Sequence, residues 1–128
     1  MNAQDMISAR ALAETFSRSA DALNTAIVGA EAALASLGLG VPANVPCGNG
    51  KLHFGKLSSG WRIFLIPDGN GQPNPLVDCS LETRYGAVDC FPALLEALIL
   101  SAERITQLVQ YATTKADEFT ASIKETTP

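Results

Sequence analysis

The segment that decides the fold is Lys51–Ile66, whose sequence is KLHFGKLSSGWRIFLI. Its two apolar halves, Lys51–Leu57 and Trp61–Ile66, flank a short polar connection that contains glycine. Two apolar runs joined in this way are typical of a β-hairpin. A third short run, Pro75–Cys79, follows, and three strands are the minimum for a stable small sheet. We therefore expect a three-stranded antiparallel sheet within residues 41–79.

The chain before the hairpin has the composition of one long helix. Residues 3–38 are rich in Ala and Leu, lack proline, and contain Gly29 as the only glycine before Gly38. Their apolar positions alternate steps of three and four residues, which is the spacing of a coiled-coil seam. Gly38 and Gly40, followed by Pro42, provide a helix C-cap and a stop. The seam positions are Met6, Ala9, Ala13, Phe16, Ala20, Leu23, Ile27, Ala30, Leu34 and Leu37.

A second helical block closes the chain. Ser80 can cap a short helix over residues 80–90, with Glu82 in its first turn. Pro92 suits the first turn of a long helix over residues 92–124 and predicts a break just before it. The seam positions of this long helix, again three and four residues apart, are Leu95, Leu98, Ala102, Ile105, Val109, Ala112, Ala116, Phe119 and Ile123.

The lengths of the two long helices predict their arrangement. At 1.5 Å per residue each is about 50 Å long, which exceeds what a compact domain of 13.4 kDa needs. We expect an α+β fold in a single domain, residues 1–128, with two long antiparallel helices side by side and the sheet inserted between them as an end cap. The alternative is a monomer in which both helices fold back on the sheet, with kinks at Gly29 or near Pro92.

The helical seam also predicts self-association. Alanine occupies seven of the nineteen seam positions, so the backbones can approach closely but each of these residues buries little area. Such a pair of helices is marginally stable alone, and we expect a homodimer that forms a four-helix bundle. The predicted oligomer interface comprises Phe16, Leu23, Ile27, Leu34, Leu98, Ile105, Val109 and Phe119.

The charge balance and the cysteine count narrow the partners and the compartment. Nine basic and thirteen acidic residues give a net charge of −4, which disfavours duplex nucleic acid and favours a protein partner with a basic surface. Cys47, Cys79 and Cys90 cannot all pair within one chain and fit a reducing compartment as free thiols. No uninterrupted apolar run approaches the roughly 18 residues of a membrane span. We therefore expect a cytoplasmic protein without membrane contact.

Motifs that would carry catalysis or hold a cofactor are weak. His53 is the only histidine, and no local motif joins it to a cysteine as a nucleophile pair. The spacings of Cys47 from His53, and of Cys79 from Cys90, differ from those of structural zinc sites. Gly48-Asn49-Gly50-Lys51 departs from the phosphate-loop pattern because leucine follows the lysine. We expect no enzyme, no metal and no cofactor.

One group of residues favours binding of a ligand or partner. The middle of the chain gathers its positive charge around the only tryptophan. Trp and Arg together can stack a planar anionic ligand such as a nucleotide, or anchor a protein partner. The alternative is that Trp61 lies in the core and that two arginines pair with Asp78, Glu82 or Asp89. The group comprises Lys51, His53, Lys56, Trp61, Arg62 and Arg84.

Three stretches, Gly60–Ile63, Ser80–Arg84 and Pro92–Leu95, resemble a pattern in small uncharacterised bacteriophage-encoded accessory proteins. The resemblance implies a small phage protein in the host cytoplasm, of the kind that includes anti-CRISPR and other inhibitors of host defence. The expected function is therefore that of a non-enzymatic homo-oligomeric interaction protein, which inhibits a host defence complex by binding a protein surface. Two alternatives stay open: capture of a small nucleotide at the tryptophan and arginine group, and a structural virion or assembly component that polymerises through the seam.

Overall fold

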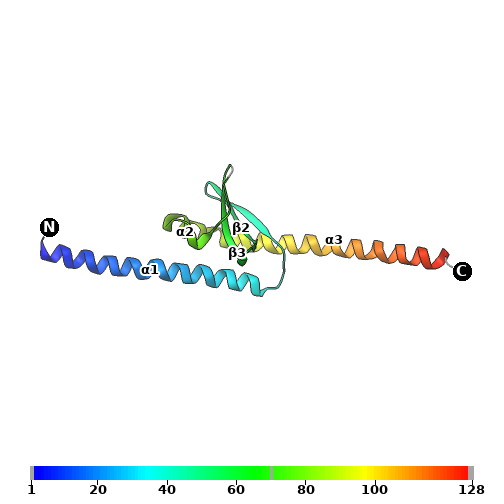
Figure 1. Ribbon diagram of the computed structural model, residues 1–128, viewed down its shortest axis with the longest axis horizontal. Coiled ribbons are helices and arrows are strands. Elements are labelled where there is room, and N and C mark those ends of the chain that lie inside the picture. Colours follow the sequence, from blue (N-terminus) through cyan, green and yellow to red (C-terminus); the bar gives the residue numbers. More distant parts are fainter. Residues whose placement is uncertain (1, 70, 127–128) are drawn as a thin grey trace.

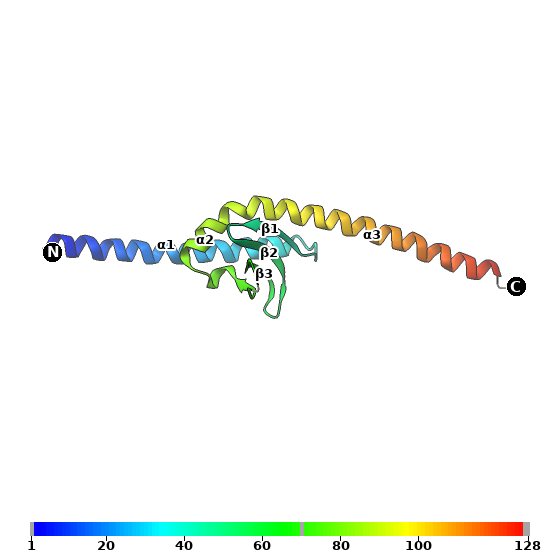
Figure 2. The same cartoon turned by 90° about the horizontal axis from the view of Figure 1, so that it is seen from above.

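The computed structural model describes residues 2–69 and 71–126, which form an elongated molecule with a small α+β body at its middle (Figures 1 and 2). The α+β class and the predicted order of helix, sheet, short helix and long helix are confirmed. Residues 1, 70, 127 and 128 of the predicted domain lie outside the described residues. The elements are α1 (Ala3–Ser36), β1 (Ala43–Cys47), β2 (Gly50–Leu57), β3 (Gly60–Pro67), β4 (Asn74–Pro75), η1 (Leu76–Asp78), α2 (Leu81–Ala87), η2 (Val88–Cys90) and α3 (Phe91–Thr126).

Both ends of α1 follow from the local sequence. The Asn2 side chain accepts a hydrogen bond from the Asp5 backbone N–H at 2.8 Å, and the Asp5 carboxylate accepts one from the Asn2 N–H, which completes a capping box. Beyond the last turn, Gly38 adopts φ 68°, a conformation that glycine reaches at little cost. The helix continues unbroken through Gly29 and ends at Ser36, two residues before the expected end at residue 38.

The sheet has four antiparallel strands in the order β1-β2-β3-β4, and not the predicted three. The hairpin is confirmed, with Leu52 of β2 opposite Leu65 of β3. Strand β1 was not predicted. It contains Pro46, and proline is tolerated there because β1 is an edge strand. The predicted third strand, Pro75–Cys79, is wrong after its first residue, because Leu76–Asp78 form a 3₁₀ turn.

One face of the sheet packs on the helices and forms the core. Its largest fully buried residues come from α1, the two central strands, η1 and α3: Ile27, Leu52, Ile63, Leu76, Leu94 and Leu98. Strand side chains alternate between faces, so Phe64 points away from this core. His53 covers Phe64 on that outer face, with the two ring centroids 5.1 Å apart.

The two long helices run in the same direction, so the predicted antiparallel pair is wrong (Figures 1 and 2). After the sheet, the chain returns along α1 through η1 and α2, and Arg84 of α2 donates a hydrogen bond to Asn24 of α1. Helix α3 therefore starts beside the second half of α1 and continues past its end. The sheet consequently lies at the middle of the molecule and does not cap one end.

Each long helix projects beyond the body (Figure 1). Every residue from 3 to 19 in α1 and from 103 to 126 in α3 is exposed. We call residues 3–19 the N-arm and residues 103–126 the C-arm. At 1.5 Å per residue the arms are about 25 and 36 Å long, and they point toward opposite ends of the molecule.

Candidate functional site on the helical arms

The arms carry large apolar side chains that the chain itself leaves uncovered. Phe16 on the N-arm is 60% exposed, and Phe119 on the C-arm is 68% exposed. Ile105 and Val109 are also exposed on the C-arm. These four members of the predicted oligomer interface are accessible to another molecule.

The other four members of the predicted interface lie in the body. Ile27 and Leu98 are fully buried, and Leu23 and Leu34 pack against the same core cluster. They stabilise the fold of the single chain, so their assignment to a subunit interface is corrected. The seam runs without interruption from arm to core, and its spacing therefore does not distinguish the two parts.

The two arms share one arrangement of large and small residues. In the N-arm, Met6 and Phe16 enclose Ala9 and Ala13 in steps of three, four and three residues. The same steps in the C-arm run through Val109, Ala112, Ala116 and Phe119. Alanines at the centre of each row allow two helix backbones to approach closely. Each arm can therefore pack against a row of the same design.

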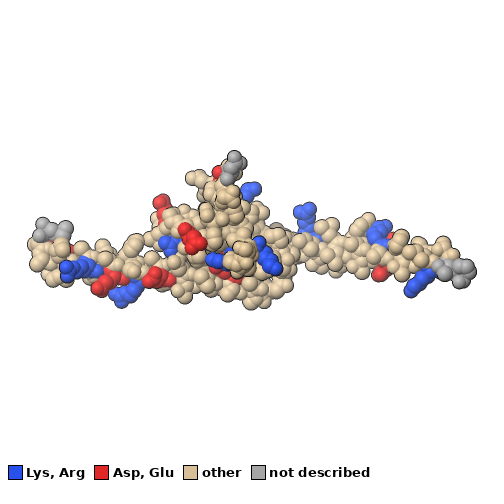
Figure 3. Space-filling view, in the orientation of Figure 1, with Lys and Arg blue, Asp and Glu red and all other residues tan. Residues whose placement is uncertain are grey.

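Charged residues of both signs are interspersed along the arms (Figure 3). The N-arm has two acidic and two basic residues, and the C-arm has four acidic and three basic residues. Lys115 and Glu118 pair at 3.5 Å, but both are exposed and such a pair contributes little stability. The arms therefore lack a strong excess of either charge, and their apolar rows are the more distinctive feature.

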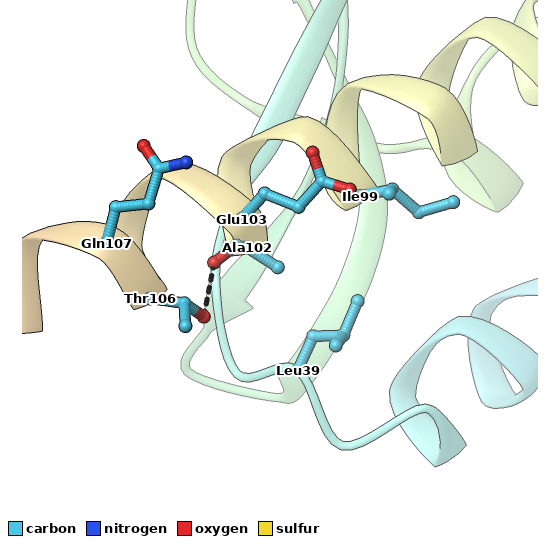
Figure 4. A pocket seen from close by; sticks show the side chains of 6 residues that line it. All are labelled: Leu39, Ile99, Ala102, Glu103, Thr106 and Gln107. Atoms are coloured by element: carbon cyan, nitrogen blue, oxygen red, sulfur yellow. Dashed lines mark hydrogen bonds between the residues drawn. The ribbon is translucent and has the colours of Figure 1, made fainter. Parts of the chain in front are cut away.

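An open hollow of about 460 Å³ lies where the C-arm leaves the body (Figure 4). Leu39, from the loop after α1, lines it together with Ile99 and Ala102 of α3. The Thr106 hydroxyl donates a hydrogen bond to the Ala102 carbonyl at 2.8 Å, so this group is satisfied within the helix. The hollow extends the apolar surface of the C-arm toward the body.

The predicted ligand-binding group is dispersed in the structure. Nε of Arg62 donates a hydrogen bond to Glu31 of α1 at 2.9 Å, and Arg84 bonds to Asn24 of the same helix. Arg62 is thus paired with a carboxylate, whereas Arg84 bonds to a neutral amide, and its buried Nε has no hydrogen-bond partner among the described residues. Both partners lie on α1 and are not Asp78, Glu82 or Asp89, which the alternative interpretation expected.

The alternation of strand side chains separates the other members of that group. Lys51 and His53 lie on the outer face, whereas Trp61 and Lys56, which are opposite each other in the register, share the inner face. Trp61 stacks on Phe54, with ring centroids 5.4 Å apart, and packs against the core. The six residues therefore do not form one cationic site.

Glu31 is a buried polar residue that sequence reasoning missed. It is 5% exposed, and its Oε2 accepts hydrogen bonds from the Ile63 backbone N–H at 2.7 Å and from Arg62. One signal was present in the sequence: Glu31 follows Ile27 by four residues, which places both on the same face of α1.

Two further features of the described residues bear on the site. By length and composition alone, the helical stretch Leu81–Thr126 could cross a membrane. The mean hydropathy of an 18-residue segment within it is 1.4, and 17% of that segment is buried. Within residues 2–69 and 71–126, no group of three or more His, Cys, Asp and Glu side chains could hold a metal ion.

The exposed apolar rows of the two arms are thus the strongest functional feature of the described part of the chain. No protein family, curated protein or solved structure matches this chain.

Proposed function

We propose that the protein is a non-enzymatic assembly component whose copies join through their helical arms. The observation that supports this most strongly is the exposure of both arms along their described length, including Phe16 and Phe119. Helices in proteins are stabilised mostly by the packing of an apolar face, and neither arm has such packing within the described chain. A second copy that covers these rows would supply that packing.

The directions of the arms favour contact between unlike arms of two copies. The N-arm and C-arm of one chain point to opposite ends and do not meet (Figure 1). The N-arm of one copy can instead lie along the C-arm of the next, because the two rows have the same spacing. A contact of this heterologous kind leaves one arm free at each end, so it propagates into a chain unless it closes into a ring.

This proposal develops the assembly alternative that the seam suggests. Inhibition of a host defence complex, a partner with a basic surface and a cytoplasmic location stay predictions. The dispersed positions of Lys51, Trp61 and Arg84 make nucleotide capture the weaker alternative.

Light scattering coupled to size-exclusion chromatography tests the proposal, over a wide range of protein concentration. We expect a mass above that of a dimer that increases with concentration, since each chain of 13.4 kDa offers two arms. A constant mass of twice 13.4 kDa would replace the open assembly with the closed homodimer. A constant mass of one chain would overturn self-association altogether.

A further inference from the structure

Two of the three cysteines meet where the sheet contacts the start of α3. Cys47 ends β1 and Cys90 ends η2, and the two residues are 43 positions apart in the chain. The Cys90 thiol donates a hydrogen bond to the Cys47 sulfur, with the Sγ atoms 2.7 Å apart. The sulfurs of a disulfide are about 2.05 Å apart, so a small movement of two side chains brings these atoms to bonding distance.

The third cysteine does not belong to this pair. The Cys79 thiol donates instead to the backbone carbonyl of Pro75 at 3.5 Å. Cys79 therefore provides a matched control within the same chain.

The cysteine pair is open to a small reagent. Cys47 and Cys90 line one cavity of about 510 Å³, between the turn that joins β1 to β2 and helix α2. Gly48, Gly50 and Gly86 form part of its wall. This volume is within the range of pockets that hold small organic ligands.

We propose that Cys47 and Cys90 form an intramolecular disulfide by exchange with a low-molecular-weight disulfide such as oxidised glutathione. The thiolate of one cysteine attacks the sulfur–sulfur bond of the reagent, which forms a mixed disulfide and releases one glutathione thiolate. The second cysteine, once deprotonated, attacks the protein sulfur of the mixed disulfide and releases the second glutathione. The protein loses two hydrogen atoms in total, and both leave on the two glutathione thiols.

The surroundings of the pair predict how its oxidation depends on pH. Burial, the hydrogen bond with Cys90, and the charges of Cys90 and Asp89 raise the pKa of Cys47 to about 12. Glu82 is a further acidic residue that lines the cavity. Because the thiolate is the nucleophile, the Cys47 thiol reacts slowly at neutral pH and disulfide formation accelerates as the pH rises.

Mass spectrometry of the oxidised full-length chain tests this proposal. The reduced protein is incubated with oxidised glutathione at about pH 8, the remaining thiols are alkylated, and the protein is digested. We expect a peptide that links Cys47 to Cys90, an alkylated Cys79, and no link between chains on a non-reducing gel. The Cys79→Ser variant should form the same link.

Two outcomes would overturn the proposal. One is that Cys47 and Cys90 are both alkylated in a chain whose Trp61 fluorescence is that of the native fold. The other is that each carries its own glutathione after prolonged incubation, which would show that the two sulfurs do not meet. Cys90→Ser should abolish the link, and if that variant does not fold, the wild type and Cys79→Ser still decide the matter.

Discussion

Glu31 on α1 accepts a hydrogen bond from the backbone N–H of Ile63 at 2.7 Å, which joins a helix side chain to the edge of a strand. Strand β4 pairs with β3 only at Phe64 and Leu65, so it does not cover this neighbouring N–H. The same carboxylate oxygen accepts from Arg62 at 2.9 Å. Glu31 thus takes the place of a strand at this edge and attaches α1 to the sheet.

We expect Glu31→Ala to lower the free energy of unfolding by about 3 kcal/mol, because it leaves a buried N–H and a guanidinium without their acceptor. Urea unfolding followed by the fluorescence of Trp61 measures the change. Glu14→Ala on the exposed N-arm is the matched control and should change stability by less than about 0.5 kcal/mol. Equal effects of the two substitutions would contradict the edge-capping role.

Burial predicts different costs for substituting two leucines of α3. Leu98 is fully buried and Leu100 is 59% exposed. We expect Leu98→Ala to cost roughly 2–5 kcal/mol, through lost burial and the cavity left behind. Leu100→Ala should cost about 0.5 kcal/mol or less, apart from any effect on assembly. Similar losses for both variants would mean that Leu98 is not a core residue.

Contact between unlike arms predicts complementation between two blocked variants. Phe16→Asp disables the N-arm and Phe119→Asp disables the C-arm, because each puts a charge in an apolar row. Each variant alone should be a monomer in light scattering, since its remaining arm has no intact partner. An equimolar mixture should form a species of twice 13.4 kDa, built from the intact C-arm of one variant and the intact N-arm of the other.

The single variants distinguish contact between unlike arms from contact between like arms. If like arms pair, Phe16→Asp alone will still dimerise through its C-arm, which would contradict the head-to-tail arrangement. Tyr85→Asp is the control, because Tyr85 is 56% exposed but lies on α2 in the body. It should assemble as the wild type does.

His53 predicts a pH dependence of stability. Burial against the outer face, followed by the charge of Lys51, lowers the pKa of His53 from its ordinary value of 6.5. The folded chain therefore binds this proton more weakly than the unfolded chain, so the contribution to stability is complete above pH 6.5 and is lost as the pH falls through the folded pKa. Because His53 is the only histidine, an NMR titration of its ring protons gives that pKa directly.

Two variants test the causes of this shift. Lys51→Gln should raise the pKa of His53 part of the way toward its ordinary value. His53→Gln should weaken the loss of stability that sets in as the pH falls below 6.5. An NMR pKa at or above 6.5 in the wild type would contradict the prediction.

Features whose determinants are close in the chain could be predicted from the sequence. Ser80 caps α2 by accepting a hydrogen bond from the Thr83 N–H at 3.2 Å, as its position before an apolar run indicates. The hairpin forms about Gly60, whose φ is 109°. Strand β1 was not predicted. Its proline is tolerated only at a sheet edge, and position in the sheet is a property of the fold. Half of the predicted interface lies in the core for a related reason. The spacing shows that a seam residue has to be covered, but only the fold shows whether the same chain covers it.

The sequence by itself determined the lengths and apolar rows of the two helices, the hairpin, and the absence of a strong catalytic motif. Only the tertiary structure decided that the helices run in the same direction and that their rows separate at residues 19 and 103 into arm and core. The physical reason is that periodicity shows which face of a helix has to be covered but not which surface covers it. That choice depends on contacts such as Arg84 with Asn24, 60 residues apart, which guide the chain back along α1 before α3 begins.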